Sequence, residues 1–263
     1  MNFTTTVMMI LVFFLLCSGI FQFTFASNLR IFNHPSEDKN WNEARRECNE
    51  KNGSLVTLYD DEDATFMRKY VTKSSSGFVS SVWLGLTKTR TNVTTWSNGA
   101  PFIFSRSSVN LPDREQICEA MDKNTWKGFT CSGKHYFMCY KGDTRIRVIN
   151  RTATWEEALD YCEENYISLL WIKDVNDQEA VKQWLEVSGY TGTFWIGLRQ
   201  SIMFGFWIWK DSPVLESNWK DDKAPEMPFS NQCGVINATD NKWSDENCFN
   251  KHPFICAEKI LKY

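Results

Sequence analysis

Apolar residues along this chain follow a helical spacing in two places. Two sets of three lie at positions i, i+3 and i+7, which form one face of a helix, and each set begins with a tryptophan. We therefore expect two helices with a buried tryptophan face. A short strand precedes each helix, at Leu29–Phe32 and at Arg147–Asn150. The two sets are Trp41, Ala44 and Cys48, and Trp155, Ala158 and Cys162.

Polar residues predict where these helices begin. In the later copy, Thr154 and Glu157 have the spacing of a capping box, in which both side chains accept hydrogen bonds from free backbone N–H groups at the helix start. Asn40 and Glu43 occupy the equivalent places in the earlier copy. Both helices should therefore start directly after the capping residue.

A second helix and a central strand follow in each copy. The helices are expected to begin near Asp60 and near Asn176, where Asn176 and Glu179 have the spacing of another capping box. The segments Trp83-Leu84-Gly85-Leu86 and Trp195-Ile196-Gly197-Leu198 are mostly apolar and predict buried strands. A glycine inside such a strand indicates close packing against another backbone.

Eight of the nine cysteines repeat together with these elements. Successive cysteines are separated by 70, 13 and 8 positions in the first set and by 71, 15 and 8 in the second. The resulting period of about 115 residues is too long for a solenoid unit and fits two copies of one globular domain. The first set is Cys48, Cys118, Cys131 and Cys139, and the second is Cys162, Cys233, Cys248 and Cys256.

The repeat divides the chain into a leader and two domains. Residues 1–26 precede the repeat, and the expected domains are residues 28–140 and 145–258. Each domain has its own tryptophans and cysteines, so we expect the two halves to fold separately. The segment between them is too short to allow much independent motion.

The leader has the composition of a secretory signal peptide. Met1–Ser27 contains no charged residue, and Val7–Leu16 is an unbroken apolar run. Thr24 and Ala26 are small enough for cleavage after Ala26, which would also remove Cys17. The mature chain would then have no membrane span. The alternative is an uncleaved signal anchor that stays in the membrane.

Composition and charge narrow the class of protein. With 43% hydrophobic and 15% aromatic residues, the chain can build ordinary globular cores. The formal net charge is −3, divided into +2 for residues 28–143 and −5 for residues 144–263. Neither half is the polycation that nucleic acid attracts, so nucleic acid is not an expected partner.

Cysteine count and sequons favour an extracellular protein. An even set of eight cysteines in the mature chain fits an oxidising compartment in which all are paired. Four sequons for N-glycosylation agree with secretion. They lie at Asn52, Asn92, Asn150 and Asn237.

Both halves resemble the C-type lectin-like domain. The matching motifs are Trp-x-x-Ala-x-x-x-Cys on the first helix, Trp-Leu/Ile-Gly-Leu in the sheet, and three closely spaced cysteines near the end, with Phe254-Ile255-Cys256 as the last strand. The resemblance implies an α+β fold with two helices, small antiparallel sheets and a long loop in each domain. The tandem arrangement is similar to secreted, fish-type relatives of the mannose-receptor group. The implied disulfides are Cys48–Cys139, Cys118–Cys131, Cys162–Cys256 and Cys233–Cys248.

Sugar-binding members of this family hold a calcium ion in the long loop. The ligands come from a Glu/Gln-Pro-Asn/Asp motif, a carboxylate before a cysteine and a Trp-Asn-Asp motif, because calcium needs about six to eight oxygens. The first domain has Leu111-Pro112-Asp113, Gln116 and Trp126-Lys127-Gly128 at these places. Leucine is no ligand and lysine repels a cation, so we expect no calcium there.

The second domain retains more of the ligand positions. Ala224-Pro225-Glu226 lacks the first ligand, Asn231 offers a carbonyl, and Trp243-Ser244-Asp245 keeps the aspartate. Asp221 and Asp222 add two loop carboxylates. We expect a solvated acidic loop and no cofactor, because a complete set of oxygens is missing. The alternative is a weak calcium site. Its ligands would be Glu226, Asn231, Ser244 and Asp245.

An enzyme is not expected. None of the three histidines lies in a metal-binding motif, phosphate-binding and serine-nucleophile motifs are absent from the sequence, and the cysteines are expected to be bonded. Two functions of different classes stay open. One is an interaction module that binds an extracellular protein, and the other is a lectin that binds a glycan, with weak calcium or without it.

The long loop of the second domain is the expected ligand site. Segments with few regular signals follow Trp96 and Trp209, and such loops on a disulfide-bonded scaffold often carry recognition. The second domain is the acidic one and retains more polar positions. The candidate ligand-binding residues are Trp219, Asp221, Asp222, Glu226, Asn231 and Asp245.

Overall fold

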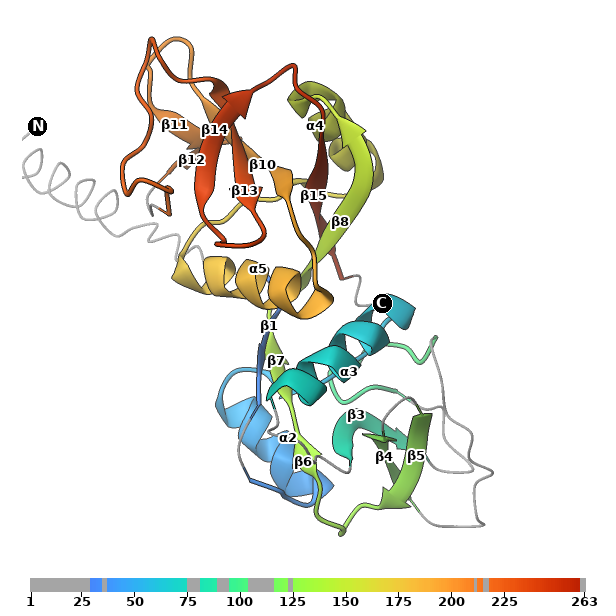
Figure 1. The fold of residues 1–263 in the computed structure, drawn as a ribbon. Helices are drawn as coiled ribbons and strands as arrows, with labels where there is room; N and C mark the ends of the chain where they lie inside the picture. Colours follow the sequence, from blue (N-terminus) through green and yellow to red (C-terminus); the bar gives the residue numbers. More distant parts are fainter. Residues whose placement is uncertain are drawn as a thin grey trace, which may run out of the picture.

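Each half of the chain contains two helices and short strands, as the repeat predicts (Figure 1). The structure is a computed structural model that describes most residues from Leu29 to Ile260. The leader, the sequon at Asn92 and the motif at Leu111–Asp113 lie outside the described residues. Within that part of the chain, no helix is both long and apolar enough to cross a membrane. The described ranges are 29–34, 37–74, 81–88, 95–103, 116–122, 125–210, 212–214 and 218–260.

The first domain contains helices α2 and α3 and two small sheets. The strand order is β1–β7–β2 in one sheet and β5–β4–β3–β6 in the other. Neighbouring strands are antiparallel except β3 and β6, which are parallel. The elements are β1 (Ile31–Asn33), α2 (Trp41–Glu50), β2 (Ser54–Leu55), α3 (Asp61–Ser74), β3 (Val82–Lys88), β4 (Ile117–Asp122), β5 (Thr125–Thr130), β6 (Tyr136–Phe137) and β7 (Cys139–Lys141).

The second domain contains helices α4 and α5 and one sheet of eight strands. The path β12–β11–β10–β13–β14 is joined by β15, which pairs with β10, β8 and β9. The predicted α+β fold is therefore confirmed in both domains. The elements are β8 (Thr144–Ala153), α4 (Trp155–Asn165), β9 (Ser168–Leu169), α5 (Val175–Ser188), β10 (Thr193–Gln200), β11 (Trp207–Trp209), β12 (Ser212–Pro213), β13 (Gln232–Asn237), β14 (Trp243–Asn247) and β15 (His252–Lys259).

All four described helices begin after a side-chain cap. The capping boxes at Asn40 and Thr154 are present, and α2 and α4 begin at the next residue, as predicted. Asp60 caps α3, which begins near Asp60 as predicted, by accepting from the N–H of Asp63 at 2.9 Å. Helix α5 begins near Asn176 as predicted, but the capping box predicted at Asn176 and Glu179 is not its cap. Asp174 caps this helix, because its carboxylate accepts from the backbone N–H groups of Asn176 and Asp177, and α5 begins at Val175.

The tryptophans join each first helix to the central strand. The indole of Trp41 donates to the carbonyl of Leu84 at 2.8 Å, and that of Trp155 donates to the carbonyl of Ile196 at 2.9 Å. Both indole side chains are buried. The glycine in the strand has the predicted role, because a Cβ at Gly197 would lie 3.1 Å from the backbone oxygens of two residues near β9.

Two disulfides bridge each domain in the pairing that the resemblance implies. The outer bridges join α2 to β7 and α4 to β15 and span 91 and 94 positions. The inner bridges span 13 and 15 positions and connect neighbouring strands near the base of the long loop. The outer pairs are Cys48–Cys139 and Cys162–Cys256, and the inner pairs are Cys118–Cys131 and Cys233–Cys248.

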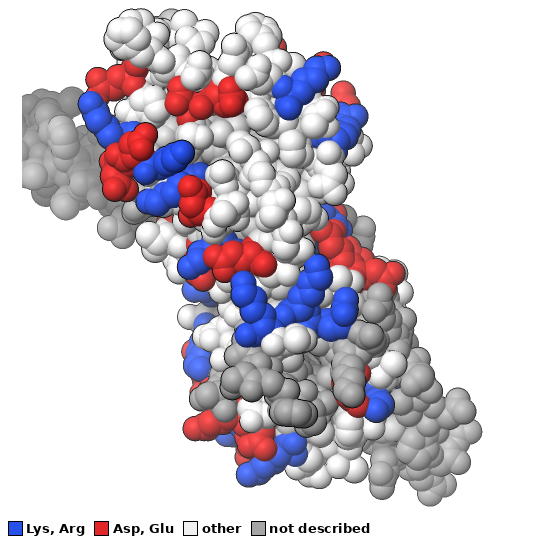
Figure 2. Space-filling model, viewed as in Figure 1, with Lys and Arg blue, Asp and Glu red and all other residues white. Residues whose placement is uncertain are grey.

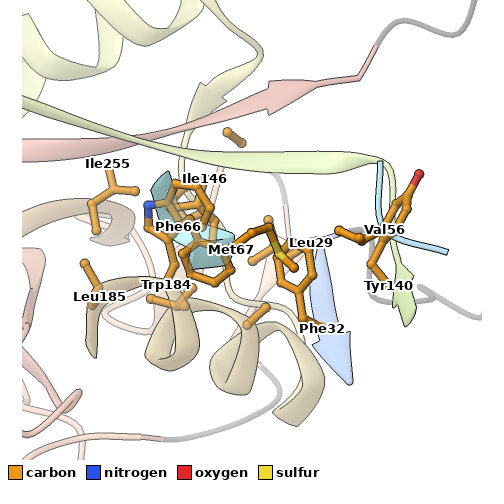
Figure 3. Close-up of a cluster of buried hydrophobic side chains, with 14 of the residues drawn as sticks. Leu29, Phe32, Val56, Phe66, Met67, Tyr140, Ile146, Trp184, Leu185 and Ile255 are labelled. Atoms are coloured by element: carbon orange, nitrogen blue, oxygen red, sulfur yellow. The ribbon is translucent and has the colours of Figure 1, made fainter. Parts of the chain in front are cut away.

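The two domains share one buried core. Helices α3 and α5 lie against each other where the domains meet (Figure 1), and a continuous cluster of buried apolar side chains runs through both. At its centre the rings of Phe66 and Trp184 stack with centroids 4.4 Å apart (Figure 3). Phe32 extends the aromatic contact, 5.0 Å from Phe66. A half of the chain alone would expose these side chains to water.

Helix α5 also completes the N-terminal strand of the first domain. The backbone N–H of Phe32 donates to Gln183 at 3.1 Å, and the amide of Gln183 donates back to the carbonyl of Phe32 at 3.2 Å. The N–H of Leu29 donates to Asp177 at 3.2 Å. These side chains therefore satisfy backbone groups that β1 would otherwise leave without partners.

Ion pairs surround the shared core. The guanidinium of Arg145 lies 2.6 Å from Asp60 and 3.2 Å from Asp63, and that of Arg147 lies 2.7 Å from Asp60. Arg147 also binds Glu62. The arginines belong to β8 and the acids to the start of α3, so the network crosses the domain boundary.

The shared core predicts that the domains unfold together. Phe66→Ala should lower the free energy of unfolding of the whole chain by about 3–5 kcal/mol, because it leaves a cavity between the domains. Denaturant titration followed by circular dichroism is the measurement. Phe249→Ala is the control, since this ring is 84% exposed and its loss should cost less than about 0.5 kcal/mol. Two separate transitions, with only one shifted by Phe66→Ala, would contradict the shared core.

The ion network predicts loss of stability in acid. Burial raises the pKa of Asp60. The backbone N–H of Asp63 and the guanidinium of Arg145 lower it by more, so that the pKa falls from an ordinary 3.8 to about 2. Its contribution is complete above about pH 4 and is lost as the pH falls towards 2. Burial raises the pKa of Glu62, so that carboxylate contributes in the opposite direction.

Stability of Asp60→Asn and of the unmodified chain should be compared between pH 5 and pH 2.5. The unmodified chain should lose more stability over this range, because the variant has no carboxylate to protonate at this position. Asp221→Asn, on an exposed loop residue, should behave like the unmodified chain. Equal pH profiles for all three proteins would show that Asp60 does not contribute.

Candidate functional site

A tryptophan cluster anchors the long loop of the second domain to the sheet. Trp219 pairs with Trp243 at the start of β14, and its ring lies 4.7 Å from that of Trp207. Its side chain is 3% exposed. Three indoles thus pack together at the base of the loop. Trp219, a predicted ligand contact, is mostly buried in this cluster and also belongs to the lining of the groove described below.

Asp221 and Asp222 form an exposed corner of the loop beside β14. The N–H of Asp222 donates to the carbonyl of Trp219, which closes a turn, and the backbone of Asp222 is left-handed with φ 56°. Its carboxylate lies 3.4 Å from the ammonium of Lys242. This corner is separated along β14 from Asp245.

Asn231 and Asp245 lie together at the other end of the loop. One oxygen of Asp245 accepts from the backbone N–H of Asn231 at 2.7 Å and from its side-chain amide at 3.0 Å. Ser244 is the neighbouring residue on β14, opposite Val235 in the strand ladder. The structure thus brings two of the predicted site residues into contact, and the contact orients N–H groups towards the carboxylate.

Glu226 is at a third place on the loop. Its carboxylate pairs with Lys223 at 2.9 Å, and both side chains are 74% exposed. The next residues form a turn in which the N–H of Phe229 donates to the carbonyl of Glu226. The predicted site residues therefore line one loop but do not converge on one point.

The carboxylate oxygens that could bind calcium lie apart from one another. Asp245 already accepts two N–H groups, Glu226 is paired with Lys223, and Asp222 is paired with Lys242. Among the described residues, no three His, Cys, Asp or Glu side chains are grouped so that they could hold a metal ion. A calcium ion needs about six to eight oxygens around one point, and the described side chains do not fit that requirement.

The first domain places a cation at the equivalent strand. Lys127 lies on β5, and its ammonium is 2.5 Å from Asp122. Most of the long loop of this domain lies outside the described residues. Among the sequons that the structure describes, Asn52 and Asn150 are exposed, whereas the side chain of Asn237 is half-buried and accepts from the N–H of Thr239.

A groove of about 510 Å³ lies between the loop and the short strands β11 and β12. The indole of Trp207 donates to the carbonyl of Pro225 at 2.8 Å, which fixes one wall to the other. The groove has apolar walls and one charged pair at its edge, so it suits a ligand with an apolar portion. Its lining is Gly205, Phe206, Trp207, Pro213, Val214, Trp219, Lys223, Ala224, Pro225 and Glu226.

Gln200 is a buried residue that sequence reasoning missed. It is 3% exposed at the end of β10, and its amide donates to the carbonyl of Gly205 at 2.7 Å and to that of Pro225 at 3.4 Å. The hydroxyl of Ser230 donates to its oxygen. One side chain thus joins two turns. The polar residue at the end of an apolar strand is the only sequence signal of this role.

Comparison with known proteins shows the same family in both halves. The family model described as Lectin C-type domain matches residues 37–141 and 151–258. C-type mannose receptor 2 of Homo sapiens is 34% identical over 110 residues, which cover 41% of this chain and 7% of the receptor. Secretory phospholipase A2 receptor of Bos taurus is 27% identical over 263 residues, which cover 84% of this chain and 17% of the receptor. This chain thus spans less than a fifth of these relatives.

Two solved structures match over less than half of this chain. Human lithostathine matches with a TM-score of 0.41 and 23% identity, covering 45% of this chain and 94% of that chain. A calcium-independent type II antifreeze protein matches with a TM-score of 0.40 and 27% identity, covering 46% of this chain and 90% of that chain.

The position of Gln200 predicts that its removal makes the fold less stable. Gln200→Ala should lower the free energy of unfolding by about 1–3 kcal/mol, because it removes a buried side chain whose amide donates to the carbonyl of the half-buried Gly205. It should also speed proteolysis of the loop. Arg199→Ala is the matched control, an exposed neighbour on the same strand. Equal losses in the two variants, measured by denaturant titration, would show that Gln200 does not join the turns.

Proposed function

This chain belongs to the C-type lectin domain family, and on that premise we propose that it is an extracellular recognition protein. In this proposal a protein or glycan ligand binds at the long loop of the second domain. The groove between the loop and β11 carries the proposal, because it is open, partly apolar and attached to a disulfide-bonded scaffold. Such loops tolerate changes that would disrupt a core.

The loop is well suited to recognition because its two ends are fixed. Trp219 packs among buried tryptophans at one end, and Asn231 is bound to Asp245 at the other. Between them, Asp221, Asp222 and Glu226 are exposed. A ligand would therefore meet polar groups in fixed positions and would not need to order the whole loop.

We propose that ligand binding does not require calcium. Three of the four carboxylates at this site are engaged by N–H groups or lysines at separate places, namely those of Asp222, Glu226 and Asp245. Calcium would have to break these contacts and still find further oxygens. The same reasoning supports a protein without any metal or cofactor.

We propose that the protein is secreted and that it is not an enzyme. The two similar proteins named above are receptors, and this similarity supports binding as the activity. The apolar leader with a cleavage site and the paired cysteines support export. N-terminal sequencing of the mature protein tests this part, since a chain that begins at Met1 would support the signal-anchor alternative.

The second candidate function is a weak calcium-dependent lectin. The contact between Asn231 and Asp245 favours it, because these two oxygen-bearing residues lie next to each other on the loop side of β13 and β14. Ser244 and Glu226 would have to join them. A site with so few carboxylates would bind calcium only at about millimolar concentration.

Calcium titration separates the two functions. Titration calorimetry of the mature chain should give no binding heat at calcium concentrations up to about 1 mM, and a glycan array should give the same signals in calcium and in chelator. A calcium dissociation constant of about 1 mM or below, with binding that Asp245→Ala abolishes and Asp221→Ala leaves unchanged, would establish the calcium-dependent lectin. It would overturn the proposal.

A further inference from the structure

Two turns at the outer end of the second domain expose six large apolar side chains. The turns are residues 201–206, between β10 and β11, and residues 226–230, before β13, and both lie far from α5 (Figure 1). The exposed fraction of these side chains ranges from 42% to 92%. We call this surface the apolar crown. Its members are Ile202, Met203, Phe204, Phe206, Met227 and Phe229.

Hydrogen bonds give the crown a fixed shape. In the first turn the N–H of Ser201 donates to the carbonyl of Phe206 at 2.9 Å, and the N–H of Gly205 donates to the carbonyl of Ser201 at 2.8 Å. Gly205 has φ 74°, a conformation that favours glycine. The rings of Phe204 and Phe206 stack with centroids 5.6 Å apart. Apolar side chains are thus displayed outwards from a rigid turn.

The buried Gln200 makes one surface out of the two turns. Its side chain binds the carbonyls of Gly205 and Pro225 and the hydroxyl of Ser230, so it contacts the first turn and both ends of the second. A rigid apolar surface loses little conformational entropy when a partner covers it. The crown is therefore ready to bind without rearrangement.

The area of the crown matches a protein interface. At about 150–250 Å² for a large aromatic side chain, the six exposed fractions amount to roughly 700 Å². The largest apolar patch of a typical monomer is about 300–600 Å². A stable interface buries about 800 Å² on each partner. The crown thus exceeds the usual patch of a monomer and approaches one side of a dimer contact.

The charged side chains around the crown indicate which kind of partner fits it. Figure 2 shows this end of the molecule mostly uncharged on the face in view, with acidic and basic side chains below it. Nearby lysines are paired with acids of the same chain, as Lys223 is with Glu226 and Lys210 is with Glu163. Anionic lipid head groups would find few free cations, and sugar hydroxyls would find few polar partners. An apolar surface is complementary to another apolar surface.

We propose that the crown is the contact between two copies of this chain. In a twofold dimer each copy presents the same patch to the other, so the apolar, uncharged crown of one copy would cover that of the second. Phenylalanine and methionine are also enriched, and charged residues depleted, at the centre of interfaces. This dimer goes beyond the proposed function. Phe206 belongs to both the crown and the groove lining, so the dimer would cover one edge of the groove, and a monomer that still binds its ligand would leave the proposed function intact.

Sedimentation velocity of the mature, oxidised chain tests the dimer. The chain should be dimeric at about 10 µM and dissociate on dilution. Phe229→Ser should raise the dissociation constant at least about 100-fold, because a twofold contact loses this 92% exposed ring twice. Ile202→Ser and Ile103→Ser form a matched pair, 78% and 80% exposed, of which only Ile202 belongs to the crown. Ile202→Ser should weaken the dimer at least tenfold, and Ile103→Ser should not change it.

Three outcomes would overturn the proposal. The chain could remain a monomer up to about 100 µM, a concentration well above the dissociation constant expected for a specific interface of this size. A dimer could form that Phe229→Ser and Ile202→Ser leave unchanged, which would place the contact elsewhere. The monomer could bind vesicles of phosphatidylcholine and lose this binding in Phe229→Ser, which would assign the crown to a membrane surface. Thermal melts of the variants ensure that each one is folded.

Discussion

The disulfide between the first helix and the last strand is the constraint on which each domain depends. It closes 91 positions in the first domain and 94 in the second, and it lies among buried tryptophans and alanines. In the chain-entropy model, such a bridge limits the unfolded state by roughly 4–5 kcal/mol. Because the bridge and the core are on the side of the helices, the long loop is free to differ in sequence. The loop around Glu226 lies apart from this disulfide-bonded core.

The second constraint is the contact between the domains. Phe66 and Trp184 stack across the boundary, and Gln183 binds the backbone of Phe32 in both directions. Because the core is continuous, the two domains pack against each other although each has a complete set of motifs. This packing also fixes the direction in which the loop of the second domain faces, which is away from the first domain (Figure 1).

Local pattern predicted the parts of the fold that depend on neighbours in sequence. The caps at Asn40 and Thr154 and the strand glycine at Gly197 need only their own segment and one close contact. Features that depend on distant partners could not be predicted in this way. Trp219 is in the core because Trp207 and Trp243 come to meet it, and periodicity does not show such a meeting. The domain contact was missed for the same reason. The crown was missed because apolar side chains in sequence normally indicate burial.

The hydrogen bonds from the N-terminal strand to α5 have a consequence for the order of events during synthesis. They join residues 148 and 151 positions apart, and the residues that supply them, Asp177 and Gln183, are made long after the first domain. Domains generally form from the N-terminus while the chain is still being extended. The backbone N–H groups of Leu29 and Phe32 therefore gain these partners only after α5 of the following domain has been synthesised.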